Sequence, residues 1–416
     1  MIALGGVSVP RIWQSRLSWR SCAHLPGLAN SHELSLNRLR HRSARLTRFL
    51  RRLRWPMTTH FAAFGEIYKL PVHVDKCIDE SRAVLQRDLE YLVGFFDGDG
   101  CVTTVSDNSG VRLSVVQSAN QAEVLMMFYH AFGGGVYLQR SGQGPLKPVL
   151  QWQIGGSSAQ RVAAIMSVVP AAKHEQLKIA ASWPSCPKLR SASVIELRRL
   201  KRSEVSPYTC PSWSYISGFF DAEGCVRVLP GKSTVSLEVV QKYVASLESI
   251  KCFLSAEVLD IQCCIYRRGD GSSTLVIRRA AHSRFILRRL LAGGMRVKRK
   301  HAEAALALSP TNKYDVRAVL ASLVGNQNRY KRLDESGCLR ALTIVALQDK
   351  RRFQIMSGKL DDTDACRQLS EIEALQMNHA LLNASAHCAA LRADIRHLLR
   401  QGAAMPDISH RSSHAV

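Results

Sequence analysis

A nine-residue segment occurs twice in this 416-residue chain. Residues 94–102 read GFFDGDGCV, and residues 218–226, which lie 124 positions further on, read GFFDAEGCV. Downstream, LSVVQ at 113–117 returns as LEVVQ at 237–241 with the same separation. Two matched blocks that keep one spacing across divergent sequence indicate a duplicated structural unit.

Both copies show the same order of helical and strand patterns. Leu89, Leu92, Val93 and Phe96 recur at the spacing of one helix face just before the first motif. Alternating strand patterns, a second helical pattern, two further strand patterns and a closing helix follow in each copy. The sequence therefore predicts an α+β fold built from duplicated αββαββα units with antiparallel sheets.

The rest of the chain sets the predicted domain boundaries. We expect the first unit at 85–184, a linker rich in proline and arginine at 185–210, and the second unit at 211–305. Residues 306–400 read as a helical extension. Residues 1–60 hold eleven Arg, no Lys and one acid. This is the composition of a mitochondrial or chloroplast import segment, of a disordered basic arm, or of sequence upstream of a start at Met57, with a nuclear or cytoplasmic protein in the last two cases. On each interpretation the segment lies outside the fold.

Charge limits the class of partner. Lys and Arg number 57 against 33 acids, a net charge of +24, and the chain beyond residue 60 is basic in its own right. Such an excess predicts a polyanionic partner, with nucleic acid as the default. Apolar residues make up 46% of the sequence, which excludes a wholly disordered chain, and no apolar run has the length of a membrane span.

The duplicated motif also predicts a metal site. Gly94 and Gly218 lie inside predicted helices, where glycine costs about 1 kcal/mol relative to alanine, so close packing of the two helices is the simplest reason for them. Such packing brings Asp99 and Glu223 together at the helix ends. Two adjacent carboxylates call for a cation, and oxygen ligands favour magnesium or manganese. In a basic protein this arrangement is typical of phosphodiester hydrolysis.

Other interpretations of these acids remain at this point. Asp99 and Glu223 would serve only as helix or turn caps if the helices did not meet. A calcium loop starting at Asp97 is excluded, because Cys101 and Asn108 stand where ligands are needed. Asp97 and Asp221 are predicted to be structural acids at helix ends. The twelve cysteines show no zinc-ligand spacing.

The two segments LVGFFDGDG at 92–100 and ISGFFDAEG at 216–224 resemble the paired motifs of the LAGLIDADG homing endonucleases in their single-chain, two-motif form. The resemblance covers about residues 85–305. It implies that Asp99 and Glu223 bind the catalytic metal with help from the carbonyls of Gly98 and Ala222.

The resemblance assigns further catalytic residues. It implies that Gln117 and Gln241, at strand ends, position the attacking water. It also implies that Lys173 and Lys298, each before the last helix of a unit, support transition-state charge, with Lys300 a competing candidate in the second unit.

The family fold is a saddle whose sheets lie along the major groove of DNA. Strand alternation places Leu150, Trp152 and Ile154 toward the core. The predicted DNA-binding residues, which face outward, are Arg112, Ser114, Gln151, Gln153, Arg227, Gln262, Tyr266, Arg268 and Arg278. Strands of ~10 residues at ~3.3 Å each predict an asymmetric target of about twenty base pairs.

Together these features predict a monomeric, site-specific, metal-dependent DNA endonuclease. The resemblance implies a double-strand break with short 3′ overhangs. Two alternatives are an RNA maturase that assists splicing of an intron RNA and a non-catalytic DNA-binding protein. Intact acids in both motifs favour the nuclease, because RNA binding alone does not require them.

Overall fold

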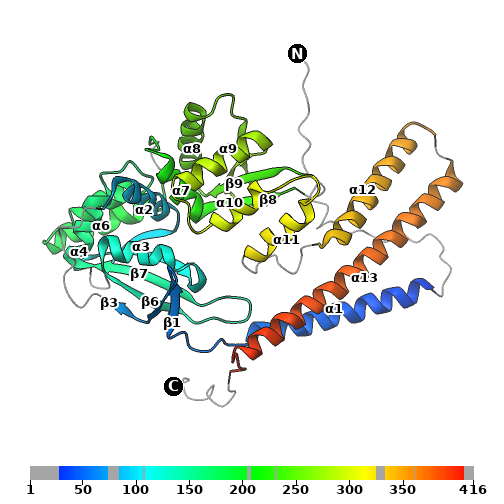
Figure 1. The fold of residues 1–416 in the computed structure, drawn as a ribbon, viewed down its shortest axis with the longest axis horizontal. Coiled ribbons are helices and arrows are strands. Elements are labelled where there is room, and N and C mark those ends of the chain that lie inside the picture. The colour runs from blue at the N-terminus through cyan, green and yellow to red at the C-terminus, as the bar shows by residue number, and fades with distance from the viewer. Residues whose placement is uncertain are drawn as a thin grey trace.

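The computed structural model describes residues 28–73, 84–105, 108–203, 208–229, 232–324, 333–359 and 361–406 (Figure 1). The first unit follows the predicted order. Its elements are α2 (Gln86–Asp99), β4 (Gly100–Thr104), β5 (Val111–Ser118), η1 (Ala119–Gln121), α3 (Glu123–Phe132), β6 (Gly135–Arg140), β7 (Val149–Gly155), α4 (Gly156–Met166) and α5 (His174–Ala181).

The second unit repeats this order. Its elements are α7 (Trp213–Glu223), β8 (Gly224–Val228), β9 (Val235–Gln241), α8 (Val244–Glu257), β10 (Cys263–Arg267), β11 (Ser273–Ile277), α9 (Ala280–Ala292) and α10 (Arg299–Leu306). The duplicated α+β fold with antiparallel sheets is therefore confirmed. In both units the predicted closing helix is a pair of helices, α4 with α5 and α9 with α10.

Each unit contributes one antiparallel sheet. The strand order is β3-β6-β7-β5-β4 in the first sheet and β10-β11-β9-β8 in the second. Strand β3 (Val72–His73), which extends the first sheet, and the hairpin β1 (His60–Ala63) with β2 (Glu66–Lys69) were not predicted. The inner sheet faces are apolar. Trp152 is fully buried 4.9 Å from the Phe128 ring, and its Nε1 donates to the Gly133 carbonyl at 2.7 Å.

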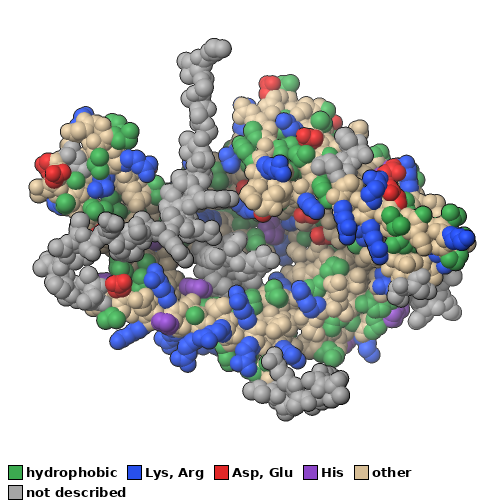
Figure 2. Space-filling view, turned by 180° about the vertical axis from the view of Figure 1, so that it is seen from behind, with side chains coloured by type: hydrophobic (Ala, Val, Ile, Leu, Met, Phe, Trp, Pro, Cys, Tyr) green, Lys and Arg blue, Asp and Glu red, His purple; other side chains and the backbone are tan. Residues whose placement is uncertain are grey.

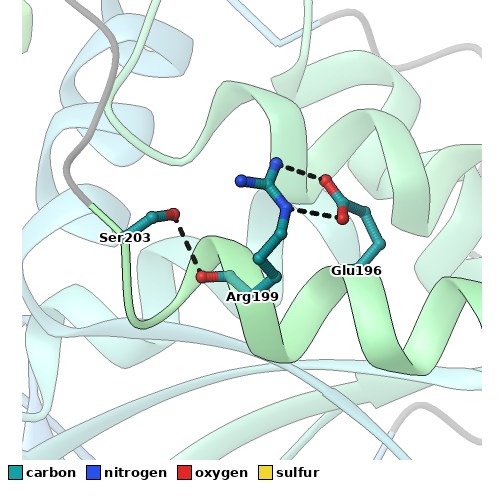
Figure 3. A network of polar contacts seen from close by, with 3 residues as sticks. All are labelled: Glu196, Arg199 and Ser203. Atoms are coloured by element: carbon teal, nitrogen blue, oxygen red, sulfur yellow. Dashed lines mark hydrogen bonds and ion pairs between the residues drawn. The ribbon is translucent and has the colours of Figure 1, made fainter.

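The predicted linker contains a helix, α6 (Pro187–Leu200), which Pro187 opens at a position where its missing N–H is not needed. Near its C-terminus, Arg199 donates two hydrogen bonds to Glu196, at 2.7 and 2.6 Å, and the Ser203 hydroxyl donates to the Arg199 carbonyl at 3.0 Å (Figure 3). These hydrogen bonds link successive turns at the C-terminal end of α6, the helix that joins the two units.

The remaining helices form an arm beside the two units (Figure 1). The arm consists of α1 (Leu28–Arg52), α12 (Glu335–Met356) and α13 (Asp362–Arg400), and α11 (Lys313–Leu323) packs on the second unit. Contrary to expectation, part of the arginine-rich N-terminal segment belongs to the fold. Leu50 and Leu53 form a small core with Leu391, Ile395 and Leu398 of α13, because one side of α1 is apolar. Residues 1–27 of that segment lie outside the described residues.

The arm is joined to the first unit through the β6–β7 hairpin. The Trp55 indole donates to the carbonyl of Gly144 at 2.8 Å, and the Trp55 amide donates to that of Gly142 at 3.0 Å. Arg54 forms β-bridges with Gln143 and with Ala404, just after α13. These contacts fix α1 and α13 relative to the first sheet. No helix in the described ranges has both the length and the apolarity needed to span a membrane.

Candidate active site at the seam between the two units

Helices α2 and α7 pack directly against each other and form the seam between the units. Gly94 and Gly218 make this approach possible. A Cβ added at Gly94 would overlap the carbonyl oxygen of Tyr215, and one added at Gly218 would overlap that of Tyr91. Each helix backbone thus lies where the other would otherwise have a side chain, as the sequence predicted.

Two reciprocal hydrogen bonds cross the seam. The Tyr91 hydroxyl donates to Asp221 at 2.7 Å, and the Tyr215 hydroxyl donates to Asp97 at 2.5 Å. All four side chains are buried. Sequence reasoning missed the tyrosines, although both stand 124 positions apart like the motifs themselves. Each unit therefore supplies a hydrogen-bond donor to a buried acid of the other unit.

Asp97 and Asp221 also hold the start of the last helix in their own unit. Asp97 accepts the backbone N–H groups of Ala172 and Lys173 at 2.6 and 2.8 Å, and Asp221 accepts those of Arg296 and Lys298 at 2.6 and 2.7 Å. Burial raises the pKa of both acids, and these hydrogen bonds oppose the rise. This is the placement expected of structural acids at helix ends.

Asp99 and Glu223 end the two seam helices and come together there. A Cβ added at Gly98 would lie 3.0 Å from Glu223 Cγ, so the ends of the two helices are in contact. The Gln117 amide donates to Asp99 Oδ2 at 2.5 Å, and Gln241 makes the equivalent hydrogen bond to Glu223. The structure thus brings together both predicted acids and both predicted glutamines.

The electrostatics of these acids suit a cation. Burial raises the pKa of Asp99, while Lys298, Lys173 and Gln117 lower it. Burial also raises the pKa of Glu223, and the Asp99 charge adds to that rise. Because both carboxylates resist ionisation where they stand, a divalent ion held between them would remove part of the penalty.

The two predicted lysines lie under the seam and contact the helix ends. Lys173 Nζ donates to the carbonyls of Phe96, Asp97 and Gly100 at 2.7–2.8 Å and lies 3.4 Å from that of Gly98. Lys298 Nζ donates to the carbonyls of Phe220, Asp221 and Ala222. Each ammonium group thus sits at the negative end of a helix dipole, in contact with a carbonyl predicted to help bind the metal.

Lys298, and not Lys300, is the counterpart of Lys173. Both Lys173 and Lys298 immediately precede the last helix of a unit, whereas Lys300 lies on the exposed surface of α10. Desolvation lowers the pKa of Lys173 and Lys298, and the charges of Asp97 and Asp221 respectively oppose this most strongly. The charge of each ammonium is therefore balanced within its own unit.

The possible metal ligands are all oxygen atoms. They are the carboxylates of Asp99 and Glu223 and the carbonyls of Gly98 and Ala222. Within the described ranges, no group of three or more His, Cys, Asp or Glu side chains could hold an ion. Oxygen donors of this kind fit magnesium, manganese or calcium better than zinc.

The predicted DNA-binding residues lie on the outer faces of the two sheets or, for Gln262, Arg268 and Arg278, just beyond the ends of β10 and β11. Arg112, Gln262, Arg268 and Arg278 are exposed and Gln151 and Gln153 are half-buried, but Ser114 is buried under its neighbours. Tyr266 and Arg278 stack at 5.6 Å, and Arg227 pairs with Glu238 at 3.2 Å. The acid Glu238 on this face was not predicted.

No family model matches the chain, and no curated protein is similar to it at a significant level. Among solved structures, the chain is similar in fold to LAGLIDADG homing endonucleases. The meganuclease I-SmaMI bound to uncleavable DNA with a TTCT central four has 14% identity and a TM-score of 0.42, with 57% of this chain and 99% of that chain covered. The LAGLIDADG meganuclease I-AabMI bound to uncleaved DNA has 13% identity and a TM-score of 0.42, with coverage of 56% and 97%. I-SmaMI with its uncleaved target and calcium ions has 14% identity and a TM-score of 0.42, with coverage of 56% and 98%.

Proposed function

We propose that this chain is a site-specific, metal-dependent endonuclease that cleaves both strands of double-stranded DNA. The observation that carries the proposal is the meeting of Asp99 and Glu223 at the ends of two helices packed around a pseudo-twofold seam. Two carboxylates from equivalent positions give one acid for each strand of a duplex. The basic outer faces of the two sheets supply the surface for that duplex.

The chain's own residues have distinct parts in this proposal. Asp99 and Glu223, with the carbonyls of Gly98 and Ala222, would hold magnesium or manganese, which supplies Lewis-acid stabilisation of the phosphate and activates water. Gln117 and Gln241 fix the two carboxylates and can orient a water molecule beside them. Lys173 and Lys298 hold the helix ends in register and offset the charge of the acids.

Cleavage by point variants tests the proposal. Asp99→Asn and Glu223→Gln should each reduce double-strand cleavage by about 10²–10³-fold or more, the scale for loss of one preorganised polar group, while DNA binding persists. The measurement is selection of cleaved sites from a randomised duplex library in magnesium buffer, followed by cleavage rates on the selected site.

Asp349→Asn is the matched control, because Asp349 is an exposed acid on α12 of the arm, away from the seam and from both sheets. Wild-type cleavage by both seam variants would refute the catalytic assignment. Binding of duplex DNA by the wild-type chain without any nick would indicate a non-catalytic DNA-binding protein. Magnesium-dependent activity on the intron RNA alone would indicate a maturase.

A further inference from the structure

Helix α1 and the two residues after it carry eight arginines without acid partners. Arg38, Arg40, Arg42, Arg45, Arg48, Arg51, Arg52 and Arg54 are all exposed. Within the residues that the structure describes, none of them forms an ion pair with Asp or Glu, and Arg40 bonds only to Asn37. Figure 2 shows basic side chains along the lower edge of the molecule, over α1. A surface of this kind attracts polyanions.

Six of these arginines divide between two faces of α1. Arg40, Arg48 and Arg51 line a hollow between α1 and α13, together with Thr47 and His387. Arg38, Arg42 and Arg45 recur at i, i+4 and i+7 on a different face and line neither this hollow nor the larger cavity beside it. The two sets contain the same residue type in the same number on one helix.

The hollow adjoins a cavity of about 1350 Å³ that is lined by residues of both units and of the arm. Thr47 and Arg51 line both spaces. The cavity wall also includes Ser118 and Val149 at the ends of β5 and β7, and Arg227 on the outer face of the second sheet. The arginines of α1 therefore adjoin the surface proposed to bind the duplex.

The acids that line this space all lie on the side of the second unit and α12. Arg140 and Lys147, on the β6–β7 hairpin, line the cavity on the side of the first unit. The acids in the lining are Glu238, which pairs with Arg227, and Asp334 and Glu335 at the start of α12. Asp334 accepts the Gly337 N–H as a helix cap. The lining on the side of the first unit and α1 thus contains cations and no acid.

We propose that Arg40, Arg48, Arg51, Arg140 and Lys147 form a basic track that binds the phosphate backbone of duplex DNA where it leaves the first unit. The inference rests on the proposed function, because the partner is the same duplex that the sheets hold. The track continues the outer face of the first sheet without an acid between them. Arginine suits the task because its planar fork contacts phosphate oxygens in pairs.

A salt titration of DNA binding tests the track. The affinity for a 40-base-pair duplex, an arbitrary length chosen as about twice the predicted site, is measured without divalent metal over a range of salt. The triple variant Arg40→Gln, Arg48→Gln, Arg51→Gln should lower the slope of log affinity against log salt by about 2–3, since each lost phosphate contact contributes about 0.9. The triple variant Arg38→Gln, Arg42→Gln, Arg45→Gln removes the same charge from the other face and should leave the slope near its wild-type value.

Three results would overturn the track: an unchanged slope in the first variant, an equal fall in both variants, or a fall seen with an RNA hairpin but not with the duplex. Equal melting temperatures of the variants show that both are folded. Because the readout needs no cleavage, the two proposals fail separately. If the slope falls only in the first variant but no nicking occurs, the nuclease proposal is refuted and the basic track stands. If cleavage is normal but the slope is unchanged, the basic track is refuted and the nuclease proposal stands.

Discussion

At the scale of single residues, Asp99 and Glu223, the proposed metal ligands, lower the stability of the folded protein. Burial raises the pKa of each acid above its ordinary value of about 4, and the charge of Asp99 adds to the rise at Glu223. An acid whose folded pKa is raised costs no stability below its unfolded pKa. The cost grows as the pH rises through the folded pKa, because the unfolded chain then holds fewer protons. A bound cation offsets this cost.

The free energy of unfolding of the metal-free protein should therefore fall as the pH rises from about 4 toward neutrality. The double variant Asp99→Asn, Glu223→Gln should show a smaller fall and a higher melting temperature at neutral pH, by about 2–4 °C for each kcal/mol regained. Magnesium should raise the melting temperature of the wild type alone. Calorimetry over a pH series measures these effects, and an equal gain from magnesium in both proteins would contradict the seam as the cation site.

The sequence predicted which acids and glutamines lie together at the seam, but it did not predict the hydrogen bonds that cross the seam. The duplicated spacing identified the acids and glutamines because each has a partner 124 positions away. Tyr91 and Tyr215 have the same spacing, yet a tyrosine on an apolar helix face reads as ordinary core. Their hydrogen bonds to Asp221 and Asp97 depend on how the two helices cross, which a sequence pattern does not specify.

At the scale of elements, the packing of α2 on α7 depends on glycine. Gly94→Ala should destabilise the protein by about 1–3 kcal/mol, because the added methyl group overlaps the Tyr215 carbonyl and the backbones must separate. The gain in helix propensity of about 1 kcal/mol offsets only part of this. The midpoint of urea unfolding measures the change.

Gly155→Ala serves as the control for this variant. Gly155 is extended, and the nearest atom to an added Cβ is the Val111 carbonyl oxygen at 3.8 Å, which is ordinary contact. An unchanged midpoint for Gly94→Ala would show that the seam tolerates wider separation and that glycine is not required there.

The two seam helices begin in different ways. The Ser212 hydroxyl caps α7 by accepting the Tyr215 N–H at 3.2 Å. Helix α2 begins at Gln86 without a side-chain cap, and Asp88 lies in its first turn, where an acid favours the positive end of the helix dipole. A sequence pattern alone does not distinguish an acid that caps a helix from one in its first turn.

At the scale of the whole molecule, the arm contains a segment whose composition did not predict its packing. The run of arginines in residues 38–54 suggested a segment outside the fold, but the leucines between them supply an apolar side that packs on α13. The partner lies about 340 residues away, as the bond from the Cys388 thiol to the Leu39 carbonyl illustrates. No local pattern identifies so distant a contact.

A chain that starts at Met57 should therefore lose order in α13. Leu391, Ile395 and Leu398 would each lose part of a burial worth about 1.5–3 kcal/mol per side chain. Hydrogen exchange of the amides of residues 388–400 should become faster, while the amides of α2 and α7 keep their protection. A chain that starts at residue 28 is the control, and unchanged exchange in α13 would show that α1 adds nothing to the arm.

The crossed tyrosine–aspartate bonds imply an interdependence between the two copies. A lone copy of the repeat would leave its motif acid without the tyrosine hydroxyl that donates to it, and a second copy meeting it symmetrically would restore that hydrogen bond. The covalent link through α6 then has a simple role, because it makes the association of the two copies intramolecular. It also frees the copies to diverge, so that one polypeptide can present two dissimilar faces to an unsymmetrical partner.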